Sequence, residues 1–210
     1  LPLLLALLAI LLVGRAAICT ANLQLTAITT KALVPGANLL TNGGFEVLRT
    51  NGFPAGWQWD RRNTDAACTV DRAQPHRGQQ ALHLTNGTAF GAHVYGMLWR
   101  TRPVALEAGK PYTLSAWVKS ERPGILSLIG GADWQYRVQA RAKDGQWHRL
   151  WMTFTPAAKD TNFVVRLNTE SPTPGVWLDD VKLEPGTAPT VDAAEAGALA
   201  LDAEAGETGV

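Results

Sequence analysis

Apolar and polar residues alternate with a period of two over most of the segment between residues 38 and 186. Leu114, Ala116 and Val118 fall on one face of such a run, and Leu150 and Met152 fall on one face of another. This period is typical of strands that have one buried face and one outward face. The predicted strands cover residues 57–61, 81–85, 93–99, 111–119, 125–129, 134–142, 148–154, 163–168 and 176–183.

These apolar runs are short, and Gly, Pro, Asn or Asp bounds most of them. No part of the segment 38–186 predicts a helix. About ten short strands joined by frequent turns are typical of an all-β protein, so we expect an antiparallel two-sheet β-sandwich, or jelly roll. A segment of about 150 residues is long enough to bury the core of one such domain.

The first residues have a different character. Residues 1–13 are almost entirely Leu, Ala, Ile and Val, and Gly14 and Arg15 end the run short of the about 20 residues that a membrane-spanning helix needs. Small residues follow, and Cys19 and Ala21 stand where a secretory signal that is cut after Ala21 requires small side chains. We expect residues 1–21 to be a signal peptide, truncated at its start, and the protein to be secreted, periplasmic or at the cell surface, with no membrane contact after cleavage. A short membrane anchor is the alternative.

Composition divides the rest of the chain into three parts. Residues 22–37 form a lead-in, and residues 38–186 form the expected sandwich. Residues 187–210 hold eight Ala and five acidic residues but no Lys or Arg, so we interpret them as a linker or the start of a following domain. Further domains of the same chain are therefore expected partners.

Charge and composition exclude two broad classes of protein. Lys plus Arg number 19 and Asp plus Glu number 18, which gives a net charge of +1 rather than the basic excess of a nucleic-acid binder. The hydrophobic fraction of 46% and the eight Trp argue against a disordered chain. After signal cleavage Cys68 is the one remaining Cys, so the domain is not a disulfide-stapled scaffold, and Cys68 is expected to be a small buried residue.

Four motifs, in this order, carry a resemblance to a known family. They are Asn38-Leu-Leu-Thr-Asn-Gly-Gly-Phe-Glu46, Gly52-Phe-Pro-Ala-Gly-Trp-Gln-Trp59, His76-Arg-Gly-Gln-Gln-Ala-Leu-His-Leu84 and Val176-Trp-Leu-Asp-Asp-Val-Lys-Leu-Glu184. The set resembles the carbohydrate-binding modules of families 4, 9 and 22, which are β-sandwiches. The resemblance implies a noncatalytic module that targets an attached polysaccharide-degrading enzyme, such as a glycoside hydrolase, to its substrate.

The residues themselves point the same way. A sugar ring has C–H-rich faces, which aromatic rings cover, and a rim of hydroxyls, which Arg, Asn and Gln bind. We expect Trp117 and Trp151 to lie on outward faces and to stack on a glycan, with its hydroxyls bound by nearby polar residues. The candidate sugar-binding residues are Trp117, Trp151, Arg149, Arg166, Asn168, Trp134, Tyr136 and Trp99. Any one of these Trp could instead fill the core, as we expect of Trp57 and Trp147.

A structural calcium ion is a further implication of the resemblance. Carried over by position, its ligands would be Glu46, the backbone around Gly78, and one of Asp179 and Asp180. Strand alternation sends Asp179 and Asp180 to opposite faces, so only one of them is expected to be a direct ligand. The alternative is that these carboxylates simply bind loop amides or a nearby Arg.

No catalytic motif stands out, and we expect this segment not to be an enzyme. The expected function is binding of a polysaccharide or oligosaccharide. Two alternatives remain: a structural sandwich that packs against neighbouring domains, and a protein-binding or adhesion module at the cell surface. A Trp-lined groove favours sugar, whereas a flat apolar patch favours protein contact.

Overall fold

The computed structural model describes residues 36–61, 65–87, 97–122, 126–141, 143–169 and 172–190. The expected signal peptide, nearly all of the lead-in and the tail from residue 191 lie outside this part, as do the first four residues of the strand expected at 93–99. The strands are β1 (Trp57–Arg61), β2 (Ala67–Asp71), β3 (Ala81–Asn86), β4 (Met97–Thr101), β5 (Val104–Ala105), β6 (Tyr112–Ser120), β7 (Leu126–Gly130), β8 (Tyr136–Gln139), β9 (Trp147–Phe154), β10 (Asn162–Phe163), β11 (Arg166–Thr169) and β12 (Thr173–Pro185).

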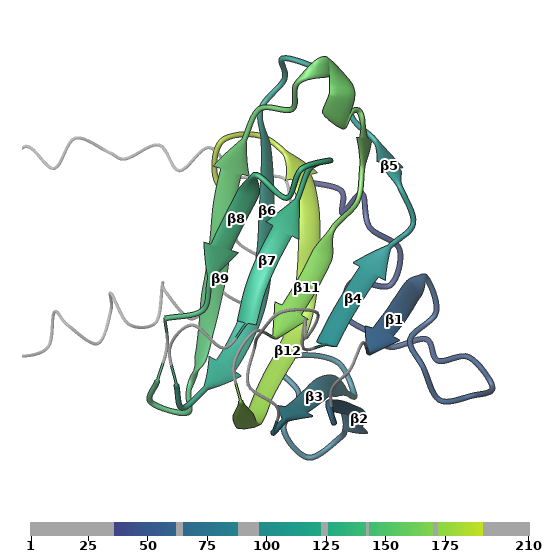
Figure 1. Ribbon diagram of the computed structural model, residues 1–210, viewed down its shortest axis with the longest axis vertical. Helices are drawn as coiled ribbons and strands as arrows, with labels where there is room; N and C mark the ends of the chain where they lie inside the picture. Colours follow the sequence, from purple (N-terminus) through teal and green to yellow (C-terminus); the bar gives the residue numbers. More distant parts are fainter. Residues whose placement is uncertain are drawn as a thin grey trace, which may run out of the picture. The chain divides into compact units, whose positions relative to one another are not determined.

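Ten of these strands form two five-stranded sheets. Sheet I has the order β1-β4-β11-β7-β8 and sheet II has the order β2-β3-β12-β6-β9, while β10 and β5 form a short separate pair. All neighbouring strands are antiparallel, and in Figure 1 the strands of sheet I lie in front of those of sheet II. In the described part, the helical content is one 3₁₀ turn, Ala158–Asp160. The expected all-β two-sheet sandwich is therefore confirmed.

The alternating pattern identifies the core faces correctly. Leu114, Ala116 and Val118 of β6 are at most 1% exposed, and Leu167 of β11 is equally buried. These side chains belong to one hydrophobic cluster that fills the space between the sheets. Burying an aliphatic side chain in this way contributes about 1.5–3 kcal/mol, so the cluster is the main source of the domain's stability.

Some strand boundaries differ from the expected ones because turn geometry interrupts them. Trp134 has φ of 60°, in the left-handed region, so β8 begins at Tyr136 and not at residue 134. The segment expected as one strand over 163–168 splits into β10 and β11, which pair with different neighbours. Strand β5 is one that the alternation did not predict.

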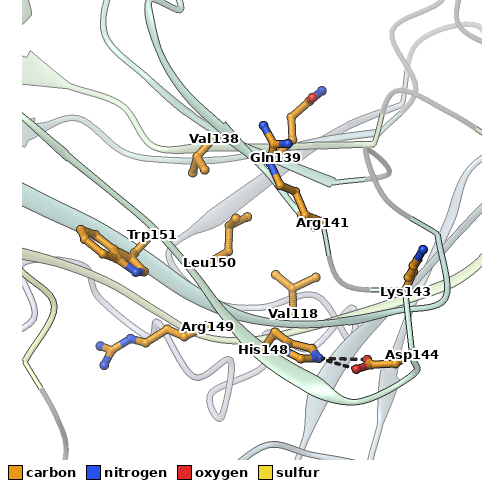
Figure 2. A pocket seen from close by; sticks show the side chains of 11 residues that line it. Val118, Val138, Gln139, Arg141, Lys143, Asp144, His148, Arg149, Leu150 and Trp151 are labelled. Carbon is orange, nitrogen blue, oxygen red and sulfur yellow. Dashed lines mark hydrogen bonds and ion pairs between the residues drawn. The ribbon is translucent and has the colours of Figure 1, made fainter.

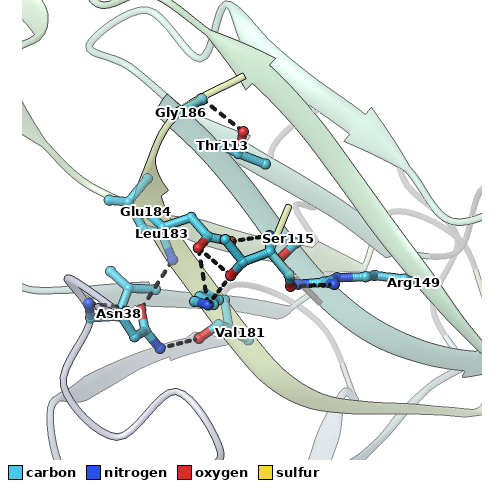
Figure 3. A network of polar contacts seen from close by, with 11 residues as sticks. Asn38, Thr113, Ser115, Arg149, Val181, Leu183, Glu184 and Gly186 are labelled. Carbon is cyan, nitrogen blue, oxygen red and sulfur yellow. Dashed lines mark hydrogen bonds and ion pairs between the residues drawn. The ribbon is translucent and has the colours of Figure 1, made fainter. Parts of the chain in front are cut away.

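The opening motif binds the closing motif through the side chain of Asn38. Its amide nitrogen donates to the Val181 carbonyl at 2.9 Å, and its amide oxygen accepts from the Leu183 backbone nitrogen at 3.1 Å, as Figure 3 shows. At Gly43 a Cβ atom would lie 2.0 Å from the Val181 carbonyl oxygen, so only Gly fits there. The two motifs are thus one structural unit, although more than 130 positions separate Asn38 from Val181 in sequence.

The described chain remains bound to sheet II beyond the expected boundary at residue 186. Thr190 donates its backbone nitrogen to Glu184 Oε1 at 2.9 Å and its hydroxyl to Glu184 Oε2 at 2.6 Å. Arg149 donates to the Thr190 carbonyl at 2.9 Å, and Thr153 donates to the Thr187 carbonyl at 3.0 Å. The sandwich therefore extends at least to Thr190.

Candidate functional site

The structure divides the candidate sugar-binding residues between two sheets. Trp117 on β6 and Arg149 and Trp151 on β9 belong to sheet II, whereas Arg166 and Asn168 on β11 belong to sheet I. Trp117 and Trp151 thus share one sheet as expected, and Arg149 is the candidate polar residue on that sheet, while Arg166 and Asn168 lie on the other. The alternation of each strand placed these side chains on outward faces, but alternation contains no information on which sheet a strand joins.

The outer face of sheet II is largely covered by other parts of the chain. His76 stacks on Trp117 with ring centroids 3.9 Å apart, and Trp147 contacts the edge of the same His76 ring. His83 stacks on Trp177 with ring centroids 4.4 Å apart, and Lys119 Nζ lies 5.0 Å from the centroid of the Trp177 ring. Trp117 and Trp177 are less exposed than Trp151, so their rings are less open to a sugar.

Trp151 is the exposed aromatic residue of sheet II, with 47% of its surface accessible. It lines the mouth of a cavity of about 520 Å³ between the edge strands β8 and β9. Val118, Val138 and Leu150 face this cavity in Figure 2, and at its rim His148 Nε2 lies 2.9 Å from both carboxylate oxygens of Asp144. Gln139, Arg141, Lys143 and Arg149 also line this cavity, so it too combines an exposed indole with long polar side chains.

The outer face of sheet I has a different composition. Gln58, Arg100 and Arg166 are consecutive partners in the strand register, and Ile129 and Arg137 continue the same row across β7 and β8. A second row of the strand register contains Asp60, Leu98, Asn168, Ser127 and Gln139. We call this surface, defined by Gln58, Arg100, Ser127, Arg137, Gln139, Arg166 and Asn168, the polar face of sheet I.

Trp134 stands at one end of the polar face, in the turn between β7 and β8. Its side chain is 39% exposed, and the Arg166 guanidinium lies 5.2 Å from its ring centroid. Arg166 also donates to the Gly131 carbonyl at 3.0 Å, which fixes the turn relative to β11. An accessible indole beside long polar side chains is the combination that the chemistry of a sugar ring requires.

Asp160 holds the turn that carries Trp134. Its carboxylate accepts from the Ala132 backbone nitrogen and from Gln135 Nε2, both at 2.8 Å. These hydrogen bonds lower the pKa of Asp160, and the bond from the Ala132 amide has the largest effect. Burial opposes this shift but does not cancel it. An ionised, fully hydrogen-bonded carboxylate therefore supports the Trp134 turn at neutral pH.

The floor of the polar face is buried and polar. Ser127 is fully buried and Asn168 is 3% exposed. The Ser127 hydroxyl has no hydrogen-bond partner among the residues that the structure describes. Buried hydroxyls almost always have a partner, so this position suits a buried water.

Tyr136 and Trp99 are the two remaining candidate residues. The Tyr136 ring packs on Phe154 and Phe163 at the core, and its hydroxyl donates to the Thr155 carbonyl at 3.0 Å. The Tyr136 ring therefore contributes to the core rather than to the polar face of sheet I. Trp99 pairs through its backbone with Trp59 and Leu167, and its side chain is outside the described part.

Gln58 and Arg100 are members of the polar face that the sequence reasoning missed. Gln58 lies between Trp57 and Trp59, and Arg100 lies in the strand after Trp99. Their signal was present in the alternation, because each is a polar residue flanked by apolar or half-buried neighbours. The Trp residues beside them attracted the prediction instead.

The candidate calcium ligands gather at the loop that contains His76. Asp179 Oδ2 accepts from the backbone nitrogens of His76 at 3.0 Å and Arg77 at 3.1 Å, and Asp180 Oδ2 lies 2.8 Å from His76 Nδ1. The prediction that alternation separates the two Asp is wrong. A bulge in β12, with Asp180 at φ of 47°, turns both carboxylates toward this one loop.

Glu46 reaches the same loop from the opening motif. Its Oε1 accepts from the Gln79 backbone nitrogen at 3.0 Å, and a Cβ atom on Gly78 would lie 2.0 Å from this oxygen. Asp179 is buried, and its burial, with the added charge of Asp180, raises its pKa to about 6. Within residues 36–190 as described, however, no three acidic, His or Cys side chains converge into a group that could hold a metal ion.

No helix in the described part of the chain is long and apolar enough to cross a bilayer. The sequence matches the family model of a carbohydrate binding domain over residues 37–175. No curated protein matches the sequence.

Solved structures with the same fold include two carbohydrate-binding modules. The CBM22-1 xylan-binding domain of Xyn10C from Paenibacillus barcinonensis superposes with a TM-score of 0.51 and 17% identity, covering 73% of this chain and 97% of that one. A family 16 carbohydrate binding module gives a TM-score of 0.51 and 21% identity, covering 70% and 99% of the two chains.

A third structure belongs to a much larger protein. The enzymatically active domain of tailspike protein 4 of bacteriophage CBA120 gives a TM-score of 0.54 and 11% identity, covering 71% of this chain and 21% of that one. This chain therefore spans about a fifth of the tailspike domain, and at such identities the likeness concerns the fold alone. The family model, in contrast, matches well over half of the sequence, and the opening and closing motifs that it spans form one bonded unit in the structure. The chain belongs to the family of carbohydrate binding domains.

Proposed function

We propose that the chain binds a glycan on the polar face of sheet I and holds an attached polysaccharide-acting enzyme on its substrate. Family membership supports glycan binding by a noncatalytic domain. The observation that carries the choice of surface is the accessible Trp134 ring beside Arg166, at the end of a face built from long polar side chains. Attachment to an enzyme, further domains in the same chain and export by a signal peptide are parts of this proposal.

The polar face can bind a sugar without performing chemistry on it. The Trp134 ring covers the C–H face of one pyranose, which removes apolar surface from water. Exposed Gln58 and Arg100 donate to hydroxyl oxygens at the rim. Aromatic stacking supplies most of the affinity in such a site, while the polar groups select the sugar.

Replacing Trp134 by alanine is expected to weaken glycan binding by about 2 kcal/mol or more, since truncation of an aromatic anchor commonly costs that much. The fold should persist, because Trp134 lies in an exposed turn. Affinity electrophoresis on a panel of soluble polysaccharides measures retention, and thermal melting checks the fold. Trp151→Ala, which removes an exposed Trp from the opposite sheet, is the matched control and should bind as the parent chain does.

The reverse result, loss of binding in Trp151→Ala with Trp134→Ala unaffected, would move the site to sheet II. Parent protein that is retained by no glycan would favour the alternatives, a structural sandwich or a protein-binding module.

We also propose that a structural calcium ion binds where the opening loop, the His76 loop and β12 meet. Asp179 and Asp180 supply carboxylate oxygens there, which are the ligand type calcium prefers, and the ion would replace some of the amide and His76 hydrogen bonds that they accept now. Its charge offsets the repulsion between the two adjacent carboxylates. The expected role is to fix the loops and not to take part in a reaction.

Calcium removal is expected to lower the melting temperature by about 5–10 °C. A ligand at 100 times its dissociation constant stabilises the folded state by about 2.7 kcal/mol, and 1 kcal/mol shifts a domain of this size by about 2–4 °C. Thermal melting with excess calcium and with EGTA measures this difference. Glu46→Gln keeps the shape of the side chain and should reduce the difference. Superimposable melting curves of the parent chain would refute the calcium site and leave the loop amides as the sole partners of Asp179.

A further inference from the structure

We propose that the glycan bound on the polar face of sheet I is anionic, with a carboxylate or sulfate group held between Arg100 and Arg166. This inference rests on the proposed glycan binding and names the class of sugar that this site selects. Both groups present negatively charged oxygens on a sugar ring, in a plane for a carboxylate and in a tetrahedron for a sulfate.

The arginines occupy one row of the sheet. Arg100 on β4 and Arg166 on β11 are direct partners in the antiparallel register, and Arg137 lies in the same row two strands further on. Side chains directly opposite each other have Cβ atoms about 5 Å apart, and like charges in that position are unfavourable. A bound anion converts this repulsion into attraction.

The described part of the structure supplies no carboxylate to neutralise this pair. No ion pair with Asp or Glu is formed there by Arg100 or Arg166, whose contacts are the Gly131 and Val164 carbonyls and the Trp134 ring. Asp60 of β1 lies in the neighbouring row of the strand register, and two acidic side chains at the Trp134 turn have other partners. Asp133 pairs with Lys159, and Asp160 accepts from the Trp134 turn.

The partial burial of Arg166 strengthens its attraction for an anion. Arg166 is half-buried, and this burial, with the nearby charge of Arg100, lowers the pKa of the Arg166 guanidinium. A partly desolvated cation without a counter-ion gains more from an incoming anion than a fully hydrated one does. The guanidinium forks of Arg100 and Arg166 match the two oxygens of a carboxylate, and Trp134 is placed to stack on the ring that bears it.

The test compares one polymer with and without its charge. Isothermal titration of the full chain with oligomers of polygalacturonate and with their methyl esters presents the same backbone with ionised and neutral carboxyl groups. We expect at least about tenfold tighter binding of the acid, the value of one charge-assisted hydrogen bond. Raising NaCl from 50 to 500 mM should remove most of this preference. Dextran sulfate against dextran distinguishes a sulfate from a carboxylate source.

Arg100→Gln is the decisive variant, because Arg100 is exposed and its removal leaves the Trp134 turn intact. It should abolish the preference for the acid, and Arg137→Gln should reduce it less. Arg72→Gln, which removes an equally exposed Arg from a loop outside sheet I, is the matched control and should keep the preference. Melting temperatures establish that the variants are folded.

Equal binding of acid and ester would overturn the anionic proposal and leave glycan binding in place. Binding of no glycan, charged or neutral, would overturn both. Binding of every polyanion with Trp134→Ala unaffected would also overturn the proposal, since it would show attraction by charge without a sugar site.

Discussion

Trp57→Ala is expected to lower the free energy of unfolding by about 3–5 kcal/mol, the usual cost of deleting a fully buried aromatic side chain. Trp57 has no accessible surface, and its ring lies 5.3 Å from that of Phe45. Its indole nitrogen donates to the Asn42 carbonyl at 3.1 Å. The substitution therefore leaves a cavity at the point where the opening motif joins sheet I, and it removes one of the two hydrogen bonds that the Asn42 carbonyl accepts.

Urea denaturation followed by fluorescence or circular dichroism measures this loss. Trp151→Ala is the control, because it removes the same side chain from an exposed position and should change the stability by less than about 1 kcal/mol. A Trp57→Ala protein that is as stable as Trp151→Ala would contradict the packing described here.

Glu184→Gln is expected to cost about 3 kcal/mol or more at neutral pH, because removal of one charge leaves a buried partner uncompensated. Glu184 is fully buried, and its Oε2 lies 3.0 Å from Lys182 Nζ. Thr190 donates two further hydrogen bonds to the carboxylate. In Figure 3 this carboxylate is the centre of the polar network that joins β12 to β6 and β9.

The same carboxylate predicts an acid-dependent loss of stability. Burial alone raises the pKa of Glu184, but the hydrogen bonds from Thr190 and Lys182 outweigh it and lower the pKa below its ordinary value. A carboxylate whose pKa is lower in the folded state contributes its full stabilisation above the unfolded pKa of about 4.3. That contribution is lost as the pH falls through the lower folded value.

Melting temperatures between pH 3 and pH 7 measure both effects. Glu184→Gln should be less stable at pH 7 and should lose less stability on acidification than the parent chain. Glu107→Gln alters an exposed carboxylate that pairs with Lys110, and it should follow the parent curve. Parallel curves for Glu184→Gln and the parent chain would show that Glu184 does not titrate in this range.

The strand faces were predictable from sequence because alternation is a local property. The apolar stripe of β6 is buried as predicted, and so are Phe163, Val165 and Leu167. The order of the four motifs also identified the family, since each motif meets a local requirement, such as the absence of a Cβ at Gly43. The sequence by itself therefore determined the class of fold, the core and the family of this protein.

Tertiary structure decided the location of the site. Arg149 and Arg166 have equivalent positions in their alternating patterns, yet β9 joins sheet II and β11 joins sheet I. His76 covers Trp117, while the distant Trp134 remains accessible next to Arg166. Strand pairing and loop packing join residues far apart in the chain, and their energies depend on the whole sandwich. A period of two is set by backbone geometry alone, and it therefore cannot distinguish an outward face that is covered from one that is open to a ligand.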